Sequence, residues 1–224
     1  MEKEPSLYAV ITGDVVDSSK IGSDHRDQLM NTLKASFRAV YSVLQKGNDP
    51  YPFDIYRGDS FQGVIRSPQD ALAASLAIRC TLRKAQPGES PISWDARTAI
   101  GIGRIDYLPE KATEGDGQAY RLSGPMLDAM KTEQRLSITT PWDDVNRELK
   151  AESALLDAVI AKWSPNQAET VLELLREQSR KEISEKFGIS QAAVHYRVKG
   201  AGWFAVGQFL ERYREIMNNR PMPE

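Results

Sequence analysis

The strand-like segments of this chain all lie before residue 141, and their order restricts the fold more than any other feature. Five segments are rich in β-branched and aromatic residues and predict strands: 7–12, 53–56, 61–65, 92–105 and 136–140. Three segments carry apolar residues at helical spacing and predict helices: 23–45, 68–87 and 117–131. The first six elements follow the order strand, helix, strand, strand, helix, strand. This order predicts an α+β fold built on a ferredoxin-like, or split βαβ, antiparallel sheet.

Two aspartates are expected to meet at one edge of this sheet. Asp14 follows the first strand in GDVVDSS, and Asp59 lies in the turn RGDS between the second and third strands. In a split βαβ unit the third strand lies between the first two and is antiparallel to both, which places the end of the first strand beside that turn. We therefore expect the Asp14 and Asp59 carboxylates to lie within about 6 Å of each other, as a shared metal requires.

Paired carboxylates suit Mg²⁺ or Mn²⁺, which bind substrate phosphates. Asp17 is a candidate third ligand or outer-shell residue of this site. Amides and polar side chains after Asp14, together with the hairpin arginine, are candidates for phosphate or nucleotide binding: Val15, Val16, Ser18, Ser19 and Arg57. The alternative is purely structural, because Asp and Gly are ordinary turn formers and each motif alone could serve only to reverse the chain.

The motifs of this region resemble known families. AVITGDVVDSS, IYRGDSFQGVI and RTAIGIGRID, in this order, resemble the palm-type core of class III nucleotide cyclases and diguanylate cyclases. That resemblance implies that Asp14 and Asp59 hold catalytic metals. More closely, GDVVDSSKI, RGDSFQG, IGIGRI and GDGQAY resemble the SatD family of bacterial proteins, over about residues 7–130.

The chain departs from the active cyclases at two places. Arg121 and Pro125 occupy the positions of the transition-state Asn and Arg, and neither supplies what that chemistry uses. The GGDEF signature of diguanylate cyclases is RGDSF here, without its glutamate. Proline also lacks the amide donor that a helix interior needs, so Gly124-Pro125 predicts an interruption of the helix at 117–131. The resemblance therefore implies a metal–nucleotide pocket and argues against cyclisation.

Beyond Pro141 the sequence predicts helices alone. We expect a domain of residues 1–140, a connector helix within 141–163 and an all-α domain of residues 164–224. Ser164, Ser179 and Ser190 are the candidate N-caps of three helices in the last domain. The second and third helices are separated only by a glycine turn at residues 187–189, which is typical of a helix-turn-helix. EISEKFGISQAAVHYRVK resembles the helix-turn-helix of sigma-factor region 4 and LuxR-type regulators.

The third helix is the expected recognition helix. Val194 and Val198 would anchor it, while Gln191 and His195 would face base edges and Lys199 would face a phosphate. The candidate DNA contacts are Gln191, Ala192, His195, Tyr196, Arg197, Lys199, Arg180 and Lys181. The alternative is a helical bundle that uses the same packing for contact with another protein.

The helix predicted at 203–217 carries one apolar stripe. Its members recur at helical spacing: Val206, Phe209, Leu210, Tyr213, Ile216 and Met217. The stripe either covers the small domain or forms a homodimer contact, which a protein reading two DNA half-sites would need.

Bulk composition sets the remaining expectations. A net charge of −2 leaves no overall positive field, so DNA binding would depend on a local patch. The single Cys80, the polar N-terminus and the lack of an 18-residue apolar run predict a cytoplasmic protein without membrane contact. Our leading interpretation is a bacterial transcriptional regulator with a metal- and nucleotide-binding N-terminal domain. The alternative is a nucleotidyl cyclase or related nucleotidyltransferase with a C-terminal regulatory or partner-binding domain.

Overall fold

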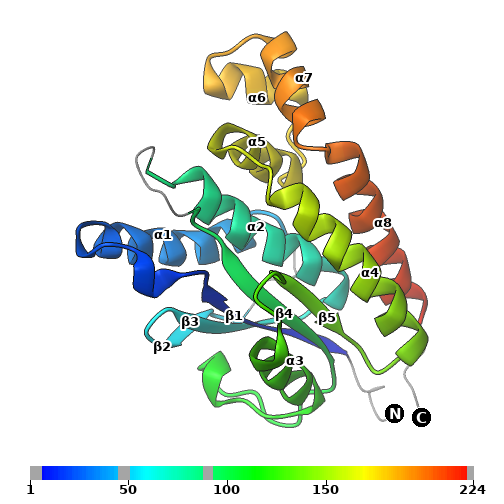
Figure 1. Cartoon of the computed structure of the whole chain (residues 1–224). Helices are drawn as coiled ribbons and strands as arrows, with labels where there is room; N and C mark the ends of the chain where they lie inside the picture. Colours follow the sequence, from blue (N-terminus) through cyan, green and yellow to red (C-terminus); the bar gives the residue numbers. More distant parts are fainter. Residues whose placement is uncertain (1–6, 45–50, 88–92, 221–224) are drawn as a thin grey trace.

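The computed structural model describes residues 7–44, 51–87 and 93–220, which form one five-stranded mixed sheet and eight α-helices, an α+β fold (Figure 1). The strands are β1 (Tyr8–Val15), β2 (Asp54–Arg57), β3 (Ser60–Ile65), β4 (Ala96–Gly103) and β5 (Leu136–Thr139). The helices are α1 (Ser23–Tyr41), α2 (Ala71–Lys84), α3 (Gln118–Ala129), α4 (Asp143–Ile160), α5 (Pro165–Leu175), α6 (Arg180–Phe187), α7 (Gln191–Gly200) and α8 (Trp203–Asn219). Short 3₁₀ turns lie at Ser18–Lys20, Pro68–Asp70 and Ala112–Glu114.

The strand order is β2-β3-β1-β4-β5. β3 pairs antiparallel with both β1 and β2, and β4 pairs antiparallel with the other side of β1. β5 adds a parallel strand beside β4, so the sheet is mixed. The hairpin β2–β3 therefore lies beside β1, as the sequence predicts for the two aspartate motifs.

β1 is longer than predicted, since it continues through Gly13 to Val15 instead of ending at Thr12. A side chain at Gly13 would collide with the Phe61 ring and the Arg97 carbonyl, so glycine here permits close packing within the sheet. Asp14 consequently lies inside the strand, directly opposite Arg97 on β4.

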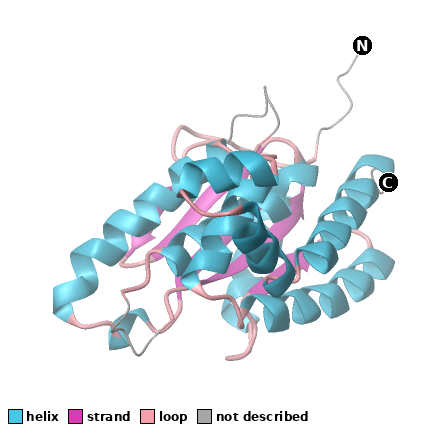
Figure 2. Cartoon of the chain, turned by 90° about the horizontal axis from the view of Figure 1, so that it is seen from above, coloured by secondary structure: helices cyan, strands magenta, loops and turns pink. Residues whose placement is uncertain are grey.

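Helices cover both faces of the sheet (Figures 1 and 2). Ile11 on β1 belongs to the main core with α1 and α2, whereas its neighbour Val10 belongs to a second core beneath α3. This alternation follows from the two-residue period of a strand. The predicted break at Pro125 is wrong, because α3 continues to Ala129 and keeps its contact with the glycines of β4.

Three of the helices beyond residue 141, namely α4, α5 and α8, share the main core. Residues from Ala9 on β1 to Met217 on α8 form one buried apolar cluster, which includes side chains of α4 and α5. All six apolar residues of the α8 stripe are buried, and the Tyr213 hydroxyl donates a hydrogen bond of 2.9 Å to the Pro68 carbonyl. The stripe therefore covers the protein itself. The boundaries at 140 and 163 stay a prediction, and the core is shared across both.

α6 and α7 lie at one end of the molecule, away from the sheet (Figure 1). A separate apolar cluster centred on Ile183, Val194 and Val198 holds them together. Among the described residues, no helix combines the length and the apolar character that crossing a bilayer would require.

Candidate functional site

A cleft of about 410 Å³ opens where β1 ends beside the β2–β3 turn. We call it the sheet-edge cleft, and twelve residues line it: Asp14, Val15, Val16, Asp17, Ser18, Ser19, Asp59, Ser60, Arg97, Met130, Thr132 and Arg135. The two predicted aspartates thus face one cleft although 45 positions separate them. Arg97 and Arg135 place positive charge in the same cleft, and neither was singled out from the sequence.

The Asp14 carboxylate is bound by Arg97. The guanidinium Nε donates to Oδ1 at 2.9 Å, and Nη2 donates to Oδ2 at 2.5 Å. This hydrogen bonding raises the pKa of Arg97, against the opposing effect of burial. The antiparallel register of β1 and β4 sets Arg97 directly opposite Asp14, and side chains of opposite charge at facing positions attract each other.

The amides after Asp14 already have acceptors within the protein. The Val15 amide donates to Asp59 Oδ2 at 3.2 Å, and the Val16 amide donates to the Asp95 carbonyl at 2.9 Å. The phosphate contacts expected of these two amides stay a prediction, and they would need the present hydrogen bonds to open. Ser18 and Ser19 also line the cleft.

Asp17 lines the sheet-edge cleft, and its role as a third ligand or outer-shell residue stays a prediction, whereas Arg57 lies outside the cleft. Asp17 has left-handed backbone geometry with φ of 51° and forms an exposed ion pair of 2.8 Å with Lys20, whose hydrogen bond lowers the pKa of Asp17. Arg57 is exposed on β2 and is not among the residues lining the cleft. Within the described part of the chain, no group of three or more His, Cys, Asp or Glu side chains is arranged to hold a metal ion. The close approach of the Asp14 and Asp59 carboxylates stays a prediction. Two carboxylates at one cation would suit Mg²⁺, because Mg²⁺ keeps several waters and binds phosphate oxygens.

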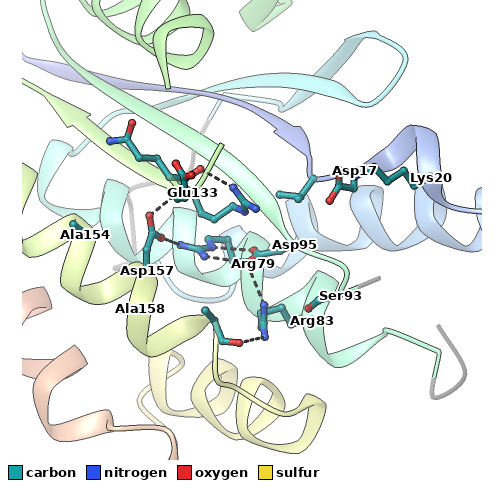
Figure 3. Close-up of a pocket in the computed structure, with 14 residues that line it drawn as sticks. Asp17, Lys20, Arg79, Arg83, Ser93, Asp95, Glu133, Ala154, Asp157 and Ala158 are labelled. Carbon is teal, nitrogen blue, oxygen red and sulfur yellow. Dashed lines mark hydrogen bonds and ion pairs between the residues drawn. The ribbon is translucent and has the colours of Figure 1, made fainter. Parts of the chain in front are cut away.

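A second cavity, of about 650 Å³, adjoins the sheet-edge cleft and shares Val16, Asp17 and Arg135 with it (Figure 3). We call it the α4 cavity, because Ala154, Asp157, Ala158 and Ala161 of the α4 segment form one wall. Arg79 lies at its centre with its side chain 1% exposed.

Arg79 is held by two aspartates. Its Nε and Nη2 donate to the Asp95 carboxylate at 2.9 and 3.0 Å, and its Nη1 donates to Asp157 at 2.6 Å. Burial alone would raise the pKa of Asp95, but the charges of Arg79 and Arg83 outweigh burial and hold that pKa below its usual value. The second Asp157 oxygen accepts from the Arg135 and Leu136 amides at 2.8 and 3.0 Å.

This network joins α2, the start of β4, the start of β5 and α4. Because Arg79 is buried and donates hydrogen bonds to two carboxylates, it fixes the position of α4. Sequence reasoning missed the network, since Arg79, Asp95 and Asp157 lie too far apart in the chain to form a local pattern.

At the other end of the molecule, α6 and α7 have well-defined ends. Ser179 and Glu182 form a capping box at the start of α6, and Gly188 ends it with a left-handed φ of 63°. The Ser190 hydroxyl accepts a hydrogen bond of 3.1 Å from the Ala193 amide and caps α7. These are the caps and the turn that the sequence predicts.

The outer surface of this helix pair carries the residues expected to contact DNA. Seven of the eight are exposed: Arg180, Lys181, Gln191, Ala192, His195, Tyr196 and Lys199. The eighth, Arg197, is partly buried with its guanidinium 5.8 Å from the centre of the Phe187 ring. Residues 179–200 contain five Lys and Arg but only two Glu, a positive surplus in a chain of net charge −2. We call these eight residues the α6–α7 surface.

Comparison with curated proteins gives no match for this chain. A family model described as the SatD family matches residues 8–208. The match extends well beyond residues 7–130, where the resemblance was recognised from the sequence, and it includes α4 to α7. Since it covers most of the chain, the protein belongs to the SatD family.

Proposed function

We propose that this protein is a DNA-binding transcriptional regulator and that α6 and α7 form its helix-turn-helix. The observation that carries the proposal is the two-sided character of α7. On its inner face Val194 and Val198 are buried, while on its outer face Gln191, His195 and Lys199 are exposed. A recognition helix needs this division, because its inner face fixes its orientation and its outer face enters the major groove.

The charge distribution supports the same proposal. Arg180 and Lys181 begin α6, and Lys199 lies in the last turn of α7, so positive charge borders the recognition helix on two sides. Phosphate contacts from such residues supply most non-specific affinity for DNA and make it depend on salt. Gln191, in the first turn of α7, is a residue type that pairs with adenine through two hydrogen bonds.

The test is an anisotropy titration of the full chain against a fluorescent pool of random-sequence duplex DNA. We expect the double variant Arg180→Ala, Lys181→Ala to weaken binding strongly at low salt. Lys34→Ala is the matched control, since Lys34 is exposed on α1, away from the α6–α7 surface. Equal binding by the parent and the double variant would contradict the proposal.

We further propose that a nucleotide with a divalent cation binds the sheet-edge cleft and regulates DNA binding. The supporting observation is that Asp14, Asp59 and two arginines line this one cleft. Asp14 and Asp59 would hold Mg²⁺ or Mn²⁺, and Ser18, Ser19 and Arg135 would contact phosphates. The bound cation would supply positive charge to phosphate oxygens. The strand order β2-β3-β1-β4 supports this proposal, because it is the order expected of a ferredoxin-like palm.

The alternative function is nucleotidyl transfer or cyclisation at the same cleft. Against it, Arg121 is exposed, forms ion pairs with Asp106 and Asp116, and does not line the cleft. Incubation with nucleoside triphosphates and Mg²⁺ or Mn²⁺ distinguishes the two functions. A regulator releases no more diphosphate than an Asp14→Asn, Asp59→Asn variant, whereas an enzyme releases clearly more.

A further inference from the structure

A groove of about 460 Å³ runs between α4 and α8, on a part of the molecule that neither proposed site uses. We call it the α4–α8 groove. Ten residues line it: Glu152, Leu155, Leu156, Val159, Phe204, Ala205, Val206, Gln208, Phe209 and Arg212. Seven of the ten are Leu, Val, Phe or Ala.

The groove holds the large exposed side chains that are purely apolar. Among the described residues, six large hydrophobic side chains are exposed, and four of them are tyrosines, which carry a hydroxyl that water can solvate. The other two are Leu155, 69% exposed, and Phe204, 82% exposed, and both line this groove. Single exposed apolar residues are normal, but their concentration in one groove is typical of an interaction surface.

The groove also contains an acid without a partner. Glu152 Oε2 is buried and has no hydrogen-bond donor among the described residues. Burial raises the pKa of Glu152, and the neighbouring Glu148 raises it further. Arg212 lies in the same groove, half exposed, and binds Glu148 at 2.8 Å. The occupant must therefore bring apolar side chains together with a hydrogen-bond donor.

We propose that the occupant is a second copy of this chain. A twofold dimer brings the same patch from both copies together, so the patch must be self-complementary. This groove meets that condition, because it presents apolar side chains and holds both the unpaired Glu152 and the donors Gln208 and Arg212, which bind Glu211 and Glu148 and carry further N–H groups. Leu155 and Phe204 of each copy enter the groove of the other, and a donor of one copy reaches Glu152 of the other.

This dimer rests on the proposed function in one respect, since reading two half-sites requires two recognition helices. α8 begins at Trp203, three residues after α7 ends at Gly200, and Phe204 is its second residue. A contact through Phe204 therefore fixes the two α7 helices relative to each other. Of the buried α8 stripe, only Val206 and Phe209 reach the wall of the groove, and the other four residues lie in the protein's own core.

The test is light scattering after size exclusion with the full chain, at about 100 μM and without DNA, since dimer formation depends on concentration. We expect twice the chain mass of 25.1 kDa for the parent and a single chain mass for the double variant Leu155→Glu, Phe204→Glu. Tyr107→Glu is the matched control, because Tyr107 is 62% exposed and lies far along the chain from this groove. Far-UV circular dichroism verifies that each variant is folded.

Three results would overturn the dimer: a monomeric parent, a double variant that stays dimeric, or dissociation of the Tyr107→Glu control as well. A DNA titration separates this proposal from the proposed function. A dimer that binds no DNA contradicts the function and leaves the dimer standing. A monomeric parent that binds DNA contradicts only the dimer.

Discussion

The charges around the α4 cavity and those on the α6–α7 surface are arranged in opposite ways. Arg79 is 1% exposed, and both of its carboxylate partners lie within 3.0 Å. On the α6–α7 surface the charges are solvated, and the nearest ion pair there, Lys181 with Glu185, spans 3.9 Å. Charges that are paired and buried fix the fold, whereas solvated charges of one sign remain available to an external anion. The first region therefore has a structural role, and the second is suited to the binding role that we propose for it.

The sheet-edge cleft lies between these extremes. Asp14 is paired with Arg97, and Asp59 accepts a hydrogen bond from the Val15 amide, yet both remain partly accessible. A ligand there would exchange contacts that the protein already makes. This arrangement suits a regulatory ligand, whose binding changes an existing equilibrium.

The largest loss of stability is expected from a substitution in the buried network around Arg79. Arg79→Ala leaves the Asp95 and Asp157 carboxylates buried without their shared cation, and breaking a buried ion pair in this way costs about 3–5 kcal/mol. Urea unfolding of the parent and the variant measures this loss. Lys34→Ala should leave the free energy of unfolding nearly unchanged. A loss below about 1 kcal/mol for Arg79→Ala would mean that the network does not hold α4 in place.

The pH dependence of the free energy of unfolding tests the structural role of this network. The pKa of Asp95 in the folded protein lies below its ordinary value of 3.8. Its contribution to the free energy of unfolding is therefore complete above that ordinary value and is lost as the pH falls through the lower folded-state value. Urea midpoints measured between neutral pH and pH 3 should fall more steeply for the parent than for Asp95→Asn. Parallel curves would show that Asp95 does not contribute to the acid sensitivity of the fold.

Substitutions of exposed residues on the α6–α7 surface should change DNA affinity rather than stability. Gln191→Ala is expected to cost about 1–3 kcal/mol on a selected DNA site and little on random DNA, as for one lost base contact. Competition titrations with both DNAs measure the difference. Its thermal midpoint should stay at the parent value, because Gln191 is exposed. Val194→Ala provides the contrast, since a cavity under α7 lowers the melting temperature first.

Local signals predicted the elements well, because caps, turns and apolar spacing are short-range. Ser179, Gly188 and Ser190 mark the boundaries of α6 and α7 where the structure has them. The meeting of Asp14 and Asp59 in one cleft followed from strand order alone. Contacts that depend on register were missed, since Arg97 opposite Asp14 requires the β1–β4 alignment. The network of Arg79 was missed for the same reason, because Asp157 reaches it only through the docking of α4.

The most direct test of the central claim is the salt dependence of DNA binding by Lys199→Ala. Anisotropy titrations at several salt concentrations give the slope of log K against log salt for the parent, Lys199→Ala and Lys34→Ala. We expect the parent to bind DNA. The slope should be smaller by about one unit for Lys199→Ala, as for one lost phosphate contact, and unchanged for Lys34→Ala. A parent that fails to bind DNA at low salt, or a Lys199→Ala variant with the parent's affinity and slope, would contradict the claim that α6 and α7 bind DNA.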